Sequence, residues 1–224
     1  MQLSLTKSTE INLVLASSSP RRKSILSLLG YDFNVVIPTD EEDKIANNIP
    51  IEEMTKSIAL GKTKQISKTY PNSTIIAADT LVSIDGLIFG KPSSKIQAKG
   101  ILTKLRGRTH QVVTGIAVID PNIEQPLVSS ESTKVTMRNY SDHEISTYLQ
   151  SGQSIDKAGA YGIQDTNFNP TQEIEGCYLN VVGLALCNLI HIFSTFNVEF
   201  SNRFLDINPD NCVFCNIFYR EDWS

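Results

Sequence analysis

Apolar and polar positions alternate in two ways along the chain. Short runs of aliphatic and β-branched residues, typical of strands, are separated by segments in which apolar residues recur at helical spacing. The predicted strands cover residues 11–16, 31–37, 73–78, 81–84, 87–89, 109–119 and 127–137, and the predicted helices cover residues 20–29, 50–70, 94–106, 141–150 and 184–196. Strands that alternate with helices in this way predict a mixed α/β domain.

Turn and cap residues support these boundaries. A Ser-rich turn leads to Pro20, Gly30 ends the first helix, and Asp85-Gly86 is the signal of a two-residue hairpin. A capping box opens the helix at residue 141. Residues 157–164 are different, because they are rich in Gly and Ala and follow neither period. That pattern predicts backbone held close to another part of the molecule.

The composition is that of an ordinary folded domain. Of the 224 residues, 41% are hydrophobic and 20% are charged, which excludes wholesale disorder and a fibrous repeat. The net charge of −4 disfavours non-specific binding of nucleic acid. A polyanionic ligand would therefore have to be met by a local group of basic residues.

Three features concern the cellular location. The first ten residues lack the apolar core of a secretory signal, and the most apolar run, residues 181–193, is shorter than the roughly 20 residues that span a bilayer. Four cysteines in a chain of this length predict reduced thiols rather than a disulfide framework. We therefore expect a cytoplasmic protein with no membrane partner.

Two consecutive arginines are the strongest local anomaly. Arg21 and Arg22 follow Pro20 in the first turn of a predicted helix, where the helix dipole disfavours cations by about 0.3–1 kcal/mol each. Two solvated surface arginines are the simpler interpretation. The alternative, which we favour, is a phosphate bound among the first N–H groups, the hydroxyls of residues 17–19 and the guanidinium groups.

Asp79 is a second anomaly, because it ends the apolar run of residues 74–78. We expect it at the C-terminal edge of a buried strand, where ligands of α/β sheets gather. Glu42 lies in an acidic loop after the second predicted strand. Taken alone, the first carboxylate is interpretable as a turn residue and the second as a solvated one. Together at a phosphate site they would suit Mg²⁺.

Several common motifs are excluded. The run from Gly86 to Pro92 is one residue too short for a phosphate-binding P-loop, and Pro92 stands where the motif needs Ser or Thr. No Gly-rich dinucleotide motif follows a strand, and the three histidines are scattered, with no catalytic triad. Cys212 and Cys215 lack the second pair that a structural zinc needs, so we interpret them as ordinary thiols.

Six motifs follow one another in a familiar order. They are Leu15-Ala16-Ser17-Ser18-Ser19-Pro20-Arg21-Arg22, Ala78-Asp79-Thr80, Gly90-Lys91-Pro92, a Gly-x-x-His-x-Val-x-Thr-Gly core within residues 105–115, residues 157–164, and Asn180-Val181-Val182-Gly183-Leu184. Over about residues 13–196 the chain thereby resembles the Maf family of nucleoside triphosphate pyrophosphatases. The resemblance implies an α/β fold with a mixed, elongated β-sheet flanked by helices and two lobes around a central cleft, similar to inosine-triphosphate pyrophosphatases.

The resemblance also implies roles for nine residues. Asp79 matches the catalytic carboxylate, and Glu42 and Asp79 match the residues that hold a divalent cation, Mg²⁺ or Mn²⁺. The triphosphate positions are matched by Ser17, Arg22, Lys62 and Lys91, and the positions associated with substrate choice by Arg21, Thr80 and Gln164. The implied reaction converts a nucleoside triphosphate to the monophosphate and pyrophosphate, often in a homodimer.

Residues 157–164 resemble the family branch that acts on dTTP and UTP rather than the branch that prefers 7-methyl-GTP. The Gln164 amide offers a donor and an acceptor, which suits the edge of uracil or thymine. Two departures concern Ala185, where the family usually has Pro, and residues 165–171, which lack some of the family's glycines. A nucleotide-binding regulator of cell division or septum formation, with little turnover, is the alternative function.

The C-terminal segment has no counterpart in the family. We predict a pyrophosphatase domain over residues 1–200 and an extension over residues 201–224. The extension carries Phe214, Phe218 and Trp223 among other large apolar residues, so we expect it to pack on the domain or on a partner subunit.

Overall fold

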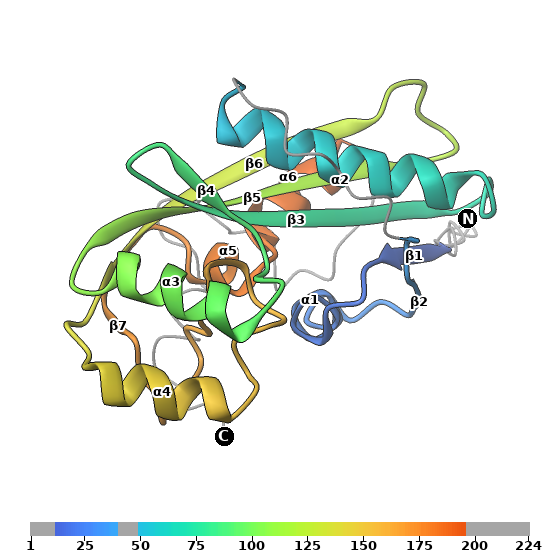
Figure 1. The fold of residues 1–224 in the computed structure, drawn as a ribbon. Helices are drawn as coiled ribbons and strands as arrows, with labels where there is room; N and C mark the ends of the chain where they lie inside the picture. The colour runs from blue at the N-terminus through green and yellow to red at the C-terminus, as the bar shows by residue number, and fades with distance from the viewer. Residues whose placement is uncertain (1–11, 40–48, 196–224) are drawn as a thin grey trace, which may run out of the picture.

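A computed structural model describes residues 12–39 and 49–195 (Figure 1). The strands are β1 (Leu13–Ala16), β2 (Phe33–Val36), β3 (Thr74–Ile84), β4 (Leu87–Phe89), β5 (Thr109–Ile119), β6 (Leu127–Met137) and β7 (Thr171–Glu175). The helices are α1 (Pro20–Ser27), α2 (Ile51–Ser67), α3 (Lys95–Leu105), α4 (Asp142–Gln150), α5 (Tyr178–Val182) and α6 (Leu186–Ser194), with a 3-10 turn η1 (Ala158–Ala160). None of these helices is long and apolar enough to cross a membrane.

The seven strands form one mixed sheet in the order β2-β1-β3-β5-β6-β7, with β4 paired to β3. β1 runs parallel to β2 and to β3. The other pairs are antiparallel: β3 with β4, β3 with β5, β5 with β6, and β6 with β7. β3 and β5 have eleven residues each and form the centre of the sheet. The predicted mixed α/β fold is therefore confirmed.

One sequence expectation about the sheet is wrong. Asp79 does not end a strand, because β3 continues from Thr74 to Ile84 and Asp79 pairs across to Gly115 on β5. The antiparallel partner on that side keeps β3 extended through the polar residues. The strand that ends at this place in the sheet is instead the parallel neighbour β1, whose last residue is Ala16.

This early end of β1 leaves a gap along one edge of β3. β1 pairs with residues 74–76 and β4 pairs with residues 82–84, so in the described structure no strand pairs with residues 77–81 on that side. Asp79 lies at the centre of the gap. We refer to residues 77–81 as the β3 gap.

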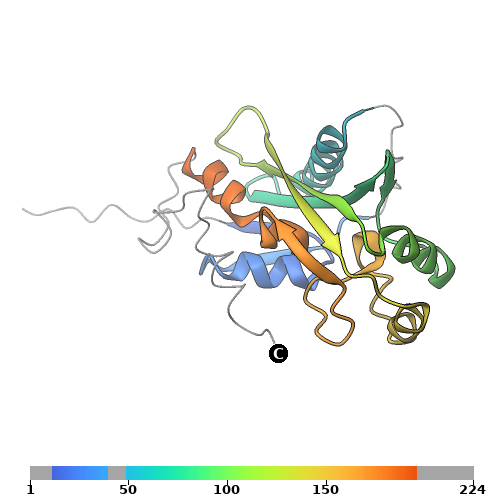
Figure 2. The ribbon, with the colours of Figure 1, turned by 90° about the vertical axis from the view of Figure 1, so that its left-hand side faces the viewer.

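The two faces of the sheet are covered differently. α2 packs along one face, against Ile75 and Ala77 near one end and Leu81 and Val113 near the other. The opposite face carries two separate helix groups, so Figure 1 shows α2 alone above the sheet and α1 and α3 below it. Figure 2 shows the same layers from the side.

The two helix groups build two hydrophobic cores. The first joins α1, α5 and α6 to β1 and the first half of β3, and contains Leu26, Ile76 and Phe193. The second joins α3, α4 and η1 to the second half of β3, and contains Val82 and Leu102. Because β3 passes through both cores, the molecule has two lobes on one continuous sheet.

β7 and α5 were not predicted. β7 reads Thr-Gln-Glu-Ile-Glu, which has too few apolar positions to show a strand period, and it forms the edge of the sheet. α5 has only five residues, fewer than two helical turns. The 3-10 turn η1 was not predicted either, and β3 joins what the sequence predicted as two strands. The remaining elements lie where the sequence predicted them, within a few residues at each end.

Candidate active site

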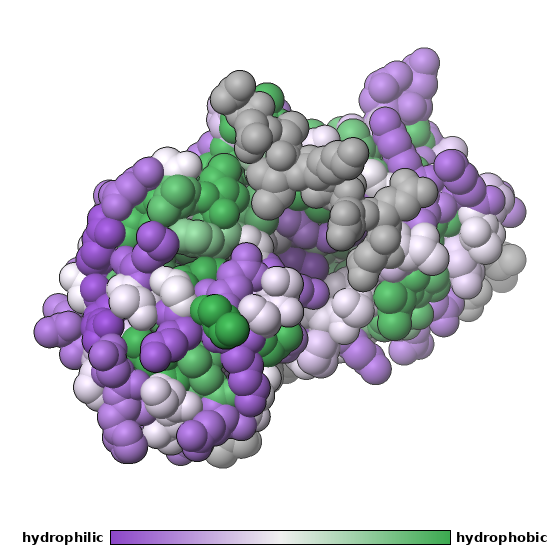
Figure 3. All heavy atoms as spheres, in the orientation of Figure 1, coloured by the Kyte–Doolittle hydropathy of each residue, from purple (hydrophilic) through white to green (hydrophobic). Residues whose placement is uncertain are grey.

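A cleft of about 940 Å³ lies at the β3 gap, between the two lobes. The space-filling view shows the molecule hollowed there, with hydrophilic side chains inside the hollow (Figure 3). Of the nine predicted site residues, the cleft brings together Ser17, Arg21, Arg22, Lys62, Asp79, Thr80, Lys91 and Gln164. Glu42 lies outside the described residues.

Asp79 faces α2 and contacts Lys62 from that helix. Lys62 Nζ lies 2.5 Å from Asp79 Oδ1, and the side chains retain 23% and 17% of their exposure. This contact depends on Gly115, which pairs with Asp79 across the sheet. A Cβ on Gly115 would lie 2.3 Å from the Thr55 carbonyl carbon, so only glycine lets α2 approach the sheet this closely. Lys62 is therefore held over Asp79 by the close packing of α2.

Thr80 faces the other side of the sheet and contacts Arg22 from α1. Arg22 Nη2 donates to Thr80 Oγ1 at 3.1 Å, and Arg22 Nε donates to the Gly183 carbonyl at 2.8 Å. Burial lowers the pKa of Arg22, Asp79 opposes that shift, and the neighbouring Arg21 adds to it. The guanidinium is thus fixed by α1, β3 and the turn after α5 at once.

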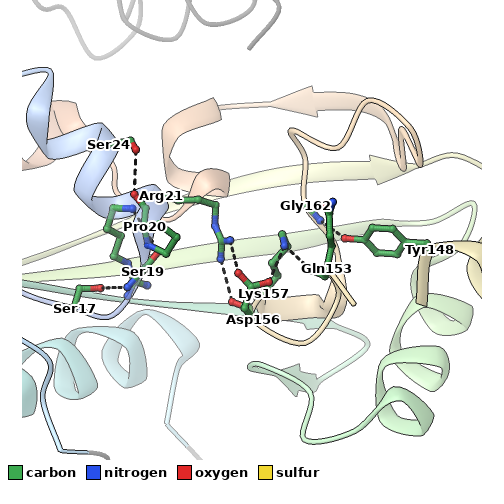
Figure 4. Close-up of polar contacts among 11 residues, drawn as sticks. Ser17, Ser19, Pro20, Arg21, Ser24, Tyr148, Gln153, Asp156, Lys157 and Gly162 are labelled. Carbon is green, nitrogen blue, oxygen red and sulfur yellow. Dashed lines mark hydrogen bonds and ion pairs between the residues drawn. The ribbon is translucent and has the colours of Figure 1, made fainter. Parts of the chain in front are cut away.

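Arg21 reaches across the cleft to the other lobe. Its Nη1 lies 2.8 Å from Asp156 Oδ2, and its Nη2 donates to the Asp156 carbonyl at 3.0 Å (Figure 4). Lys157 Nζ lies 2.7 Å from the second carboxylate oxygen. Partial burial raises the pKa of Asp156, but the hydrogen bonds from Lys157 and Arg21 outweigh it and leave the pKa below its usual range. Asp156, which the sequence did not indicate, thereby holds Arg21 at the mouth of the cleft.

The Ser-rich turn before α1 is organised by its own hydroxyls. Ser17 Oγ accepts from the Ser19 backbone N–H at 3.1 Å, and Ser19 Oγ caps α1 by accepting from the Arg22 N–H at 3.4 Å. The backbone N–H groups of Ser19 and Arg22, which we expected to be available to a bound anion, therefore already donate hydrogen bonds within the protein. The predicted phosphate site would rely on the Ser17 hydroxyl, the remaining N–H groups and the side-chain cations.

Positive charge accumulates in the cleft. Burial lowers the pKa of Lys91, and the nearby Arg22 and Lys62 lower it further, whereas Asp79 raises it. Together with Arg21 these cations outnumber Asp79 and Asp156, the carboxylates among the lining residues that the structure describes. A cleft with this excess in a chain of net charge −4 is suited to a polyanion.

The irregular segment that carries Gln164 forms one wall of the cleft. Gly159 has φ +71°, and a Cβ there would lie 2.8 Å from Val82 Cγ2, so the predicted close approach of backbone is confirmed. Tyr161 lines the cleft and its hydroxyl lies 2.8 Å from His110 Nε2 on β5. Burial lowers the pKa of His110 to about 4, so this histidine is neutral at neutral pH.

The residues partly fit a divalent cation. In the described part of the chain no group of three or more His, Cys, Asp or Glu side chains could enclose a metal ion. Asp79 offers its second carboxylate oxygen, because Lys62 contacts only Oδ1. Mg²⁺ is commonly held by one or two carboxylates with phosphate oxygens and water. The donor set therefore suits a cation that is bound together with phosphates, not a closed protein cage.

The sequence matches one protein family and relatives that share one name. The family model described as a Maf-like protein matches residues 12–196. The chain is 45% identical over 177 residues to a dTTP/UTP pyrophosphatase from Dictyoglomus thermophilum, covering 79% of this chain and 92% of the relative. It is 40% identical over 212 residues to a dTTP/UTP pyrophosphatase from Dehalococcoides mccartyi, covering 93% of both chains.

Among solved structures, a HAM1 protein from Coxiella burnetii matches at 14% identity with a TM-score of 0.40, covering 58% of this chain and 74% of that chain.

Proposed function

Because the chain belongs to the Maf family, we propose that it hydrolyses dTTP and UTP to the monophosphate and pyrophosphate, and so removes nucleotides from the pool. The observation that carries this proposal is the cationic cleft around Asp79, in a chain whose curated relatives have this activity by name. No observation on the described residues favours the regulatory alternative.

The cations of the cleft would bind the triphosphate. A nucleoside triphosphate carries close to four negative charges, which need fixed donors in a partly dry site. Arg22 and Lys91 face the cleft from opposite lobes, and Lys62 approaches from the other side of the sheet. These three side chains, with the Ser17 hydroxyl, would hold the phosphates along the β3 gap and place the α-phosphorus near Asp79.

Asp79 would orient the attacking water and accept its proton. Water attacks the α-phosphorus, the bond from that phosphorus to the bridging oxygen breaks, and pyrophosphate leaves with the electron pair. Lys62 beside Asp79 would help to neutralise the charge that develops on the phosphoryl oxygens. A divalent cation, Mg²⁺ or Mn²⁺, held by Asp79 and by Glu42, would supply charge neutralisation and acidify bound water.

Base recognition would fall to the three residues associated with substrate choice, all of which line the cleft. The Gln164 amide offers a donor and an acceptor, and Thr80 and Arg21 line the same cleft. We further propose that the enzyme acts in the cytoplasm as a homodimer.

We also propose that the C-terminal extension, residues 201–224, packs on the domain or on a partner subunit. Truncation after Phe200 tests this proposal. An unchanged melting temperature and an unchanged oligomeric state in the truncated protein would contradict it.

The proposed activity is tested with a panel of canonical and modified triphosphates in Mg²⁺ or Mn²⁺, with pyrophosphate and orthophosphate assayed separately. We expect pyrophosphate from dTTP and UTP. Orthophosphate as the product would mean that a different bond is broken. Absence of pyrophosphate from every nucleotide, with binding retained, would favour the regulator.

A further inference from the structure

A chain of hydrogen bonds runs from the cleft into the protein interior. Arg22 Nη2 contacts Thr80 Oγ1 at 3.1 Å, Thr80 Oγ1 lies 2.9 Å from Thr114 Oγ1, and Thr114 Oγ1 lies 2.9 Å from the Asn180 carbonyl. Thr80 and Thr114 are direct partners across β3 and β5. Thr114 and Asn180 are completely buried.

In each of these three hydrogen bonds, the donor and the acceptor can be assigned. A carbonyl only accepts, so the single hydroxyl proton of Thr114 goes to Asn180. Thr114 must then accept from Thr80, whose own proton is thereby used. A guanidinium only donates, so Arg22 occupies one of the two lone pairs on Thr80. The hydroxyl of Thr80 therefore has no proton for a ligand and one lone pair left.

The Asn180 end of the chain is firmly held. Asn180 Nδ2 donates to the Val112 carbonyl and to Thr133 Oγ1, at 2.9 Å each. Thr133 Oγ1 also accepts from the Cys177 N–H at 3.1 Å. These contacts fix α5 on β5 and β6, so the carbonyl that receives the Thr114 proton cannot turn away.

We propose that Thr114 is a positioning residue that makes Thr80 a hydrogen-bond acceptor for an N–H of the base, which in uracil and thymine is the imide N3–H. The proposal rests on the proposed function. Phosphate oxygens are acceptors and would meet a lone pair on Thr80. Sugar hydroxyls can donate or accept, so a fixed direction would not distinguish among them. Only the base edge has donors and acceptors in fixed places.

A fixed acceptor would discriminate uracil from cytosine. Cytosine has a lone pair at N3 where uracil has a proton, so CTP would set two lone pairs against each other. Groups left unpaired in a partly dry site weaken binding strongly, which is how sites built for one hydrogen-bond pattern reject another. Loss of the Thr114 hydroxyl would free the Thr80 proton and let Thr80 donate to the cytosine ring.

The test compares Thr114→Val, which has nearly the same shape but no hydroxyl, with Thr114→Ser, which keeps the hydroxyl. The ratio of kcat/KM for UTP and CTP is measured well below the melting temperature of both variants. We expect Thr114→Val to lower the UTP preference by about tenfold. We expect Thr114→Ser to keep the wild-type ratio. Binding of inorganic tripolyphosphate should be the same in wild type and both variants.

A double-mutant cycle shows whether Thr114 acts through Thr80. In a Thr80→Val background, Thr114→Val should leave the UTP to CTP ratio as it is. A further change in that background, a wild-type enzyme without UTP preference, or a Thr114→Val variant that keeps the preference would overturn the inference. Equal weakening of UTP and tripolyphosphate binding would also overturn it, because the damage would then be at the phosphates.

Failure of the proposed function gives a different result. The same variants are titrated calorimetrically with UTP and CTP in EDTA, where no turnover is needed. A wild-type protein that prefers UTP, with the preference reduced in Thr114→Val, supports the inference even if no pyrophosphate is released. Equal binding of both nucleotides by the wild-type protein contradicts it.

Discussion

Asp79 and Thr80 are neighbours in the chain, yet they lie on opposite faces of β3 in unlike surroundings. On the carboxylate side, Asp79 meets Lys62, and both side chains reach solvent. On the hydroxyl side, Thr80 is held by Arg22 and by the buried Thr114. One side offers charges that a ligand can rearrange, whereas the other offers a hydrogen-bond direction that the protein has already set.

This contrast has an energetic consequence. The Asp79–Lys62 pair is largely buried but opens onto the cleft, where water can hydrate a charge that has lost its partner. Changes on the carboxylate side should therefore affect turnover more than folding. Buried polar networks are costly to leave partly unsatisfied. Changes on the hydroxyl side should therefore affect stability as well as selectivity.

The largest effect is expected from Asp79→Asn, which tests the carboxylate side. The substitution removes the proton acceptor and the partner of Lys62, so pyrophosphate release from UTP should fall by about a thousandfold. Thermal unfolding followed by circular dichroism should stay close to wild type. Turnover near the wild-type rate would remove Asp79 from the mechanism.

His110 extends the hydroxyl side and allows a test by pH. It lies on the same face of β5 as Thr114, and its pKa is lowered by burial from 6.5 to about 4. Between these values the unfolded chain binds a proton that the folded chain does not, so stability falls as the pH drops from about 6.5 to about 4. The loss amounts to about 3 kcal/mol.

Urea unfolding at several pH values between 7 and 4 measures this loss, with His110→Gln as the matched variant. The variant should be less stable at pH 7, because the contact with Tyr161 changes, but should show a flatter dependence on pH. An unchanged slope in His110→Gln would assign the pH dependence to other groups.

Gly115→Ala tests the limit of this contrast. Gly115 pairs with Asp79 on the carboxylate side, yet its substitution should lower the free energy of unfolding. The new Cβ would collide with the backbone of Thr55 and Lys56, so α2 would have to move away from the sheet. We expect a loss of about 2 kcal/mol and a higher KM, since Lys62 moves with α2. Gly100→Ala on α3, where a Cβ meets nothing within 4 Å, is the control. Wild-type stability and KM would mean that α2 tolerates the shift.

The smallest effect is expected from Asp156→Asn at the mouth of the cleft. The Asp156 side chain is 53% exposed, so the loss of its pair with Arg21 should change the free energy of unfolding by less than about 1 kcal/mol. Differential scanning calorimetry measures the shift. A loss several times larger would show that the contact between the lobes supports the fold and not only the orientation of Arg21.

The two residues of the carboxylate side were predicted on different grounds. Asp79 was indicated by its place after an apolar run, and Lys62 by the resemblance to the Maf family, and both line the cleft. The long strands at residues 109–119 and 127–137 were predicted with their observed ends, because their alternating pattern is clear and turns flank them.

The hydroxyl side was only partly readable. Thr80 was predicted, but its partners depend on the register of β3 with β5 and on α5, a helix too short to show a period. Asp156 was missed because a carboxylate in a polar segment carries no signal of its own. The role of Asp79 at a strand end was wrong because strand continuation depends on the antiparallel partner β5.

The unbroken course of β3 and β5 beneath the cleft also bears on how a nucleotide is captured. Both lobes are built on these two strands, so within residues 12–39 and 49–195 they are not joined by a flexible linker about which they could rotate as hinged domains do. The conformational entropy of placing one lobe against the other is then lost during folding, before any ligand binds, and binding need not supply it. Selectivity in such a molecule comes less from closing around the right nucleotide than from presenting a fixed array of protons and lone pairs that the wrong one cannot match.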